Sequence, residues 1–303
     1  MTRFLLRRIL SALVLVFAVA SGAQLLAQLA PGSYGDRIGR STDEIARERH
    51  RLGLDQPIAT QYATWLRRSI TLDFGESFYY QQPVTALVVE RARNTAILAT
   101  SALGVATLIG IPWGVLTGSR RDGVLAAVLR GTSLLLLSVP PLISALVLLT
   151  IAAGTGWLPV SGMGGLSHLV IPTFALALPI AATLERLQAQ SIAEALARPS
   201  TLAARARGIS GTRILWRHAW RQSLAPMLAI YGIVIGSLFS GSFAVEIVTS
   251  WPGLGALMLQ ALIARDTYLV AGCAAAGAAF LALGVLASDI VHLLVDPRLD
   301  ANA

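Results

Sequence analysis

The stretch TAILATSALGVATLIGIPWGVLT, residues 95–117, contains no charged side chain in 23 consecutive positions. A helix rises about 1.5 Å per residue, so this segment is long enough to cross a hydrocarbon layer about 30 Å thick. Gly110 and Pro112 would weaken a helix in water, but a membrane bundle tolerates them because neighbouring helices satisfy the freed backbone groups. The segment therefore predicts a transmembrane helix.

The rest of the chain repeats this pattern. Hydrophobic residues make up 55% of the sequence and charged residues 13%, against about 25% charged in a typical soluble domain. We therefore expect an all-α integral membrane protein with six transmembrane helices, in which small residues such as Gly232 and Gly272 allow close helix packing. The five other apolar runs cover residues 9–30, 124–153, 168–187, 225–248 and 268–295.

The arginines near the apolar runs indicate the orientation. Arg3, Arg7 and Arg8 precede the first run, as in a secretory signal, but the run continues to residue 30, so we expect an uncleaved first helix over residues 1–30. Arginines also gather in the loops after the second and fourth runs, and basic loops favour the cytoplasmic side. Both termini are therefore predicted to be cytoplasmic, with a periplasmic loop over 31–94 and a five-helix core over 95–303.

Other function classes find little support in the sequence. The formal net charge is +8, but the 24 basic residues, all arginine, form no single patch, so we expect no nucleic-acid partner. The four histidines are scattered, Cys273 is the only cysteine, and no GxxxxGK[ST] motif is present. We therefore expect no catalytic residue, no metal site and no cofactor bound by this chain.

Residues 192–224, between the fourth and fifth runs, form the most informative loop. Pro199 suits the first turn of a helix, and Gly208 suits a left-handed helix end. We therefore expect a short helix that ends at Gly208 and a second short helix that begins at Thr212.

Two roles fit this loop. Its alanines and glycine would let a partner protein approach the backbone closely, and its arginines could bind the partner's carboxylates. Arg213, Arg217 and Arg221 also recur every four residues beside two tryptophans, which equally suits a helix that lies on lipid head groups. The residues alone leave protein docking and lipid contact open.

Four segments in order resemble one family. EAL at 194–196 and AARARGIS at 203–210 are similar to the EAA loop of ABC importer permeases, in the form seen in oligopeptide and dipeptide permeases. The other three segments resemble the first loop of that family, the segment after its fifth span and its C-terminal end. They are LGLDQP (52–57) with DFGES (73–77), SWPGLG (250–255) and DPR (296–298).

This resemblance implies a type I ABC importer permease fold and the first, B-type, permease subunit, in the bacterial cytoplasmic (inner) membrane. It implies di- or oligopeptides as cargo, with nickel chelates or glutathione as alternatives. It also implies two sets of site residues. The expected ATPase-coupling residues are Ala203, Ala204, Arg205, Arg207 and Gly208, and the candidate pathway or periplasmic-gate residues are Glu246, Trp251, Pro252 and Gly253.

The expected partners are a second and usually different permease subunit, two cytoplasmic ATPase subunits or domains, an extracytoplasmic solute-binding protein and membrane lipid. ATP and Mg would be bound by the ATPase partners, since this chain lacks the phosphate-binding loop. Two alternative functions are an ion-gradient secondary carrier and a membrane-embedded transferase.

Overall fold

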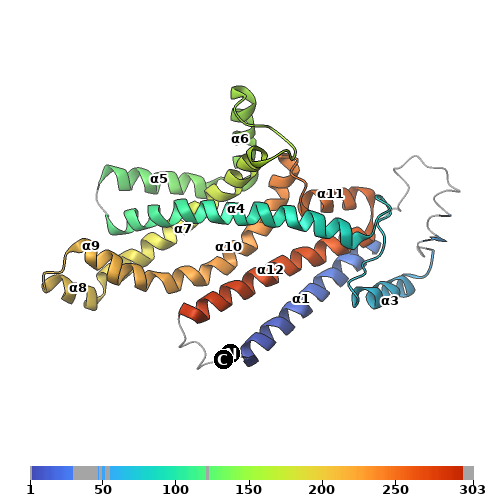
Figure 1. The fold of residues 1–303 in the computed structure, drawn as a ribbon, viewed down its shortest axis with the longest axis horizontal. Helices are drawn as coiled ribbons and strands as arrows, with labels where there is room; N and C mark the ends of the chain where they lie inside the picture. The colour runs from blue at the N-terminus through green and yellow to red at the C-terminus, as the bar shows by residue number, and fades with distance from the viewer. Residues whose placement is uncertain (1, 30–46, 48–49, 52–54, 121–122, 296–303) are drawn as a thin grey trace. The chain divides into compact units, whose positions relative to one another are not determined.

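The computed structural model describes residues 2–29, 47, 50–51, 55–120 and 123–295 (Figure 1). Within these residues the regular structure is helical, apart from one isolated bridge between Glu76 and Pro83. The prediction of an all-α protein is confirmed. The elements are α1 (Thr2–Leu29), α3 (Ile58–Ser69), α4 (Val84–Ser119), α5 (Val124–Ser138), α6 (Pro141–Thr155), α7 (Leu166–Ala197), α8 (Pro199–Ala206), α9 (Gly211–Ile214), the π-helical η1 (Leu215–Ala219), α10 (Trp220–Val248), α11 (Leu254–Ala264) and α12 (Thr267–Val295).

Five of the described helices are long and apolar enough to cross a membrane, or six if one bent pair counts as a single span. That pair is the apolar run at 124–153, which was predicted as one span. α5 and α6 meet at an angle of 105°, because Pro140 and Pro141 lack the backbone N–H that would continue α5. Val139, the residue before Pro140, is extended, and Pro141 opens α6, as the steric limits around proline require.

The chain divides into two compact units. The first comprises Met1–Phe4, Ile97–Trp251 and Leu283–Ala303, and the second comprises Leu5–Ala96 and Pro252–Ala282. In the first unit α7 packs against α5, α6 and α10. Its core contains the fully buried Leu176, Leu184 and Leu238.

Within the first unit, three glycines let α4 approach α7 very closely. A Cβ atom built at Gly110 would lie 2.5 Å from the carbonyl oxygen of Ala181, and one at Gly118 would lie 2.5 Å from that of Ala189. Gly114, midway between them, is equally tight. The spacing of four residues aligns the three glycines along one face of α4, as in small-residue contacts between membrane helices.

The expectation of close packing at Gly232 and Gly272 is confirmed. In the first unit, a Cβ at Gly232 would lie 3.2 Å from the Cβ of Ser288. In the second unit, a Cβ at Gly272 would lie 2.5 Å from Cγ1 of Val84.

The second unit contains α3, α11 and an ordered strap, residues 70–83, that leads into α4. In α3, Trp65 is buried beside the rings of Tyr62 and Phe74. Backbone hydrogen bonds hold the strap in place, including one of 2.9 Å from the N–H of Val84 to the carbonyl of Gly75.

A buried carboxylate, Asp266, ties this strap to the start of α12. Its oxygens accept hydrogen bonds from the hydroxyl of Ser77 (2.6 Å) and from the backbone N–H groups of Tyr79 (3.2 Å) and Leu269 (3.1 Å). Burial raises the pKa of the Asp266 carboxyl above its ordinary value, and the hydrogen bonds lower it by less than that. Asp266 is thus the polar centre that holds the strap against α12.

We expect Asp266→Asn to lower the stability of the chain at neutral pH by about 1–3 kcal/mol, because the amide NH2 would face a hydrogen-bond donor. The folded chain holds the Asp266 proton more tightly than the unfolded chain. The part of its contribution that depends on the bound proton is therefore full below about pH 3.9 and is lost as pH rises through the raised pKa. The hydrogen bonds that its oxygens accept still contribute at neutral pH. Melting temperatures of the purified chain between about pH 4 and 8 would measure this difference.

Asp73→Asn is the matched control, since Asp73 is exposed and makes only a local bond of 3.0 Å to the N–H of Gly75. It should leave both the stability and its pH dependence nearly unchanged. An Asp266→Asn chain that melts like the wild type at every pH would contradict the role given to this carboxylate.

Candidate functional site: the loop between α7 and α10

The first short helix of the loop, α8, begins where it was predicted. Arg198 is extended, and Pro199 occupies the first helical position, where its missing N–H leaves no bond unmade. The hydroxyl of Thr201, a fully buried side chain, donates a 2.8 Å hydrogen bond back to the carbonyl of Ala195 in α7. α8 is therefore attached to α7 through a single connecting residue.

The end of α8 is a left-handed cap at Gly208, also as predicted. Gly208 has a φ of +79°, which a residue with a side chain adopts only with strain. Its N–H donates to the carbonyl of Arg205 at 3.0 Å, and the N–H of Ile209 donates to that of Ala204 at 3.3 Å. This pair of bonds is a Schellman motif, which closes the helix and turns the chain sharply.

The five predicted coupling residues lie on different faces of α8. Ala203, Arg205, Arg207 and Gly208 are exposed. Ala204 is only 3% exposed and supports α8 from inside the unit instead of facing outward. Sequence reasoning missed Leu202, which adds an apolar side chain, 51% exposed, to the outer surface of α8.

The second part of the loop differs from the prediction. A separate short helix was expected from Thr212, but the helix begins at Gly211 and runs through η1 into α10 without a break. The junction residues Leu215 and Trp220 keep right-handed helical backbone angles, because no glycine or proline interrupts the chain there. Arg213, Arg217 and Arg221 are exposed along this helix.

The loop rests on a buried apolar cluster, which we call the base of the loop. Val115 of α4, Ile192 and Ala195 of α7 and Ala219 of η1 form one buried apolar cluster. Figure 1 shows α8 and α9 at the end of the first unit where α7 ends and α10 begins.

Polar contacts strengthen the same base. Gln188 of α7 donates a 2.9 Å hydrogen bond from Nε2 to the hydroxyl of Ser223 in α10. The hydroxyl of Thr117 in α4 donates to the buried carboxylate of Glu185 in α7. α8 is joined to α7 through Arg198 alone and to α9 through residues 207–210.

The second predicted set of residues lies around the end of α10. Glu246 and Trp251 are buried in the first unit, with exposed fractions of 0% and 3%. Ser250 has a φ of +54°, and the N–H of Trp251 donates a 2.9 Å hydrogen bond to the carbonyl of Glu246. The chain thus makes a tight hydrogen-bonded turn here, while a pathway or gate role for these residues stays a prediction.

Pro252 and Gly253 belong to the second unit. The side-chain amide of Asn94 donates a 2.8 Å hydrogen bond to the carbonyl of Pro252, and the N–H of Leu254 donates to the hydroxyl of Thr95 at 2.8 Å. These bonds attach the start of α11 to α4. A pathway role for Pro252 and Gly253 also stays a prediction.

Residues 52–54 of the LGLDQP segment and the whole DPR segment, residues 296–298, lie outside the described residues. In the part of the chain that is described, no group of three or more His, Cys, Asp or Glu side chains is placed to hold a metal ion. The loop between α7 and α10, called the coupling loop after its predicted role, is therefore the best-defined candidate site.

Two protein-family models match this chain. A family model described as binding-protein-dependent transport system inner membrane component matches residues 110–301, which include the whole loop between α7 and α10. The chain belongs to this family. The N-terminal model of the same transport-system membrane components matches residues 1–99. The resemblance to ABC importer permeases is thereby confirmed.

Individual members of the family align with nearly the whole chain. The dipeptide transport system permease protein DppB of Lactococcus lactis subsp. cremoris is 31% identical, with 98% of this chain and 99% of the relative covered. A putative peptide transport system permease protein of Brucella abortus is 33% identical, with the same coverage. The oligopeptide transport system permease protein AppB of Bacillus subtilis is 29% identical over 99% of this chain and 100% of its own length.

Proposed function

We propose that this chain is a transmembrane permease subunit of an ATP-binding-cassette importer that carries di- or oligopeptides into the cell. The observation that carries the proposal is the exposed helix α8, fixed between two long apolar helices in a chain of this family. The peptide cargo is proposed because the relatives are named as dipeptide, oligopeptide or peptide transport permeases.

In this proposal α8 faces the cytoplasm, with both chain termini on the same side, and docks on an ATPase subunit. Ala203 and Gly208 place no bulky side chain on the docking surface. Arg205 and Arg207 offer hydrogen-bond donors for acidic side chains of the partner. When two ATPases close on ATP and Mg, they would move α8 and with it the ends of α7 and α10. Such a movement drives transport only if the ATPases bind one state of the permease more tightly than the other.

The same proposal requires three further partners. A second permease subunit, usually a different chain, would complete the path through the membrane. An extracytoplasmic solute-binding protein would deliver the peptide on the side of residues 31–94. Lipid would cover the exposed apolar side chains of helices such as α1.

Purification of this chain from its native membrane in mild detergent, followed by mass spectrometry, tests the proposal. We expect ATPase subunits and a second permease of similar size to copurify with it. Recovery of the chain alone, together with transport into vesicles that persists without ATP, would instead support an ion-gradient carrier.

A further inference from the structure

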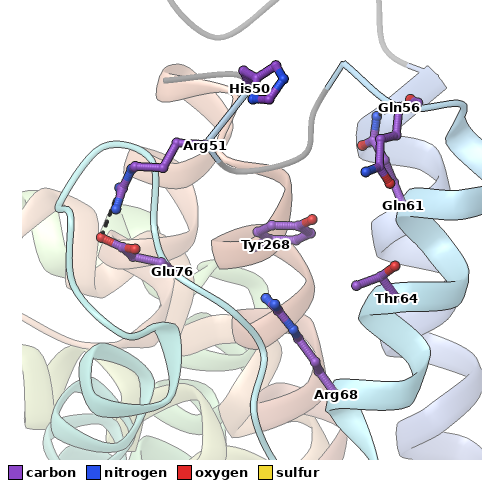
Figure 2. A pocket seen from close by; sticks show the side chains of 8 residues that line it. All are labelled: His50, Arg51, Gln56, Gln61, Thr64, Arg68, Glu76 and Tyr268. Carbon is purple, nitrogen blue, oxygen red and sulfur yellow. Dashed lines mark hydrogen bonds and ion pairs between the residues drawn. The ribbon is translucent and has the colours of Figure 1, made fainter. Parts of the chain in front are cut away.

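The second unit contains a polar cavity of about 410 Å³ (Figure 2). Helix α3 contributes Gln61, Thr64 and Arg68, while Glu76 of the strap and Tyr268 of α12 complete the walls used in the argument. This volume falls in the range of small-molecule sites, about 300–1,000 Å³. The cavity lies wholly within the loop predicted to be extracytoplasmic and the start of α12, far along the chain from the coupling loop.

The cavity holds one positive charge without an acidic partner among the described residues. Figure 2 shows the Arg68 side chain pointing from α3 toward the ring of Tyr268. Arg51, on the opposite wall, is already paired with Glu76 at 3.2 Å. The guanidinium of Arg68 is therefore the group available to bind an anion, and its planar fork matches a carboxylate.

Close packing holds the wall that contains Tyr268. A Cβ built at Gly75 would lie 3.2 Å from the Tyr268 ring, so the strap backbone rests directly on this ring. The Phe78 ring also packs against the Tyr268 ring, with the two ring centroids 5.1 Å apart. Asp266, two residues before Tyr268, fixes the same strap. A wall held in this way loses little freedom when a ligand binds.

Neutral polar groups line the remaining cavity. Thr64 offers a hydroxyl group, and Gln61 offers an amide that also donates a 2.8 Å hydrogen bond to the carbonyl of Gln56. Such groups suit the N–H and C=O of a peptide unit. The carboxylate of Glu76, although paired with Arg51, can also accept a hydrogen bond from an amine.

We propose that this cavity binds a small amino-acid or dipeptide ligand through its carboxylate, which Arg68 holds, while its amide or amine groups face Thr64, Gln61 and Glu76. The site differs from the coupling loop and requires no ATPase. It would give this chain a direct contact with a peptide. This inference rests on the cavity itself. It relies on the proposed function only for the side of the membrane to which the cavity opens.

Isothermal titration of the purified full-length chain in lipid nanodiscs tests this site, with alanyl-alanine as the probe. We expect one site per chain, and binding weaker by about tenfold or more for Arg68→Gln, because a charge-assisted contact is lost. Arg67→Gln is the matched control, since Arg67 is the adjacent exposed arginine of α3 and does not line the cavity. Its affinity should stay within about twofold of the wild type.

A second comparison needs no variant and so does not depend on folding. Alanyl-alaninamide keeps the peptide group but lacks the carboxylate, and the wild-type chain should bind it at least about tenfold more weakly than alanyl-alanine. Equal binding of the two probes, an Arg68→Gln chain that binds like the wild type, or no binding of alanyl-alanine to the wild type would each overturn the proposal. None of these outcomes changes which subunits copurify, so the importer proposal is tested separately.

Discussion

Replacing Gly114 with leucine is expected to prevent α4 and α7 from packing and to remove most of the correctly folded protein. A Cβ at this position would lie 2.5 Å from the Cβ of Gln188 and 2.6 Å from the backbone oxygen of Glu185. The backbone oxygen cannot rotate away, so α7 itself would have to move. That shift would also disturb the bonds of Gln188 to Ser223 and of Glu185 to Thr117.

Alanine at the same position gives a graded version of the test. Overpacking by small groups costs about 1–3 kcal/mol, so Gly114→Ala should lower the melting temperature by several degrees, and leucine should exceed that range. Size-exclusion profiles and melting curves of detergent-solubilised protein measure both effects.

Gly104→Ala provides the control on the same helix. A Cβ at Gly104 meets no atom within 4 Å, so the substitution should be neutral or slightly stabilising because alanine favours helix. If Gly114→Leu gave the same yield and melting curve as Gly104→Ala, the close contact between α4 and α7 would be contradicted.

The parts of the fold that could be predicted are those with a local physical cause. Long apolar runs predict membrane helices because every residue in the run adds to the favourable free energy of transfer from water into lipid. Pro199 and Gly208 could be read as the start and end of α8 because each has a conformational preference that does not depend on distant contacts. The same reasoning applied to Pro140 and Pro141 would have indicated the bend between α5 and α6.

The features that were missed depend on contacts between distant parts of the chain. The spacing of Gly110, Gly114 and Gly118 is visible in the sequence as a small-residue stripe, but it does not identify α7 as the helix that packs there. Asp266 and Ser77 are 189 positions apart, so no local pattern connects them. The continuous helix from Gly211 into α10 likewise replaces two predicted elements, because residues 212–225 contain no glycine or proline.

The cavity around Arg68 also depends on contacts between distant parts of the chain. The Arg68 guanidinium becomes a candidate site only because Tyr268, from the start of α12, closes the wall beside it. The coupling loop is the opposite case, since its residues are neighbours in sequence and one short helix presents them. Site residues on a single local element are therefore easier to predict than those that two distant segments bring together.

Replacing Gly208 with arginine is expected to uncouple ATP hydrolysis from uptake in the assembled importer. Gly208 is exposed, and a Cβ there meets no atom of this chain within 4 Å. The arginine side chain would therefore project from the surface of α8 that we propose docks on the ATPase, and it would hold the partner away. The φ of +79° adds local strain of about 1–2 kcal/mol for a residue with a side chain.

Two variants separate bulk from strain. Gly208→Asn adds a smaller side chain that tolerates the left-handed conformation, and Ser200→Arg adds the same bulk and charge in the first turn of α8, at an exposed position outside the predicted coupling residues. We expect both to retain most peptide uptake per ATP hydrolysed in reconstituted proteoliposomes, while Gly208→Arg loses nearly all of it. Normal coupled uptake by Gly208→Arg would show that α8 does not dock closely at Gly208, and the coupling contact would then have to be sought along the exposed arginines between Gly211 and α10.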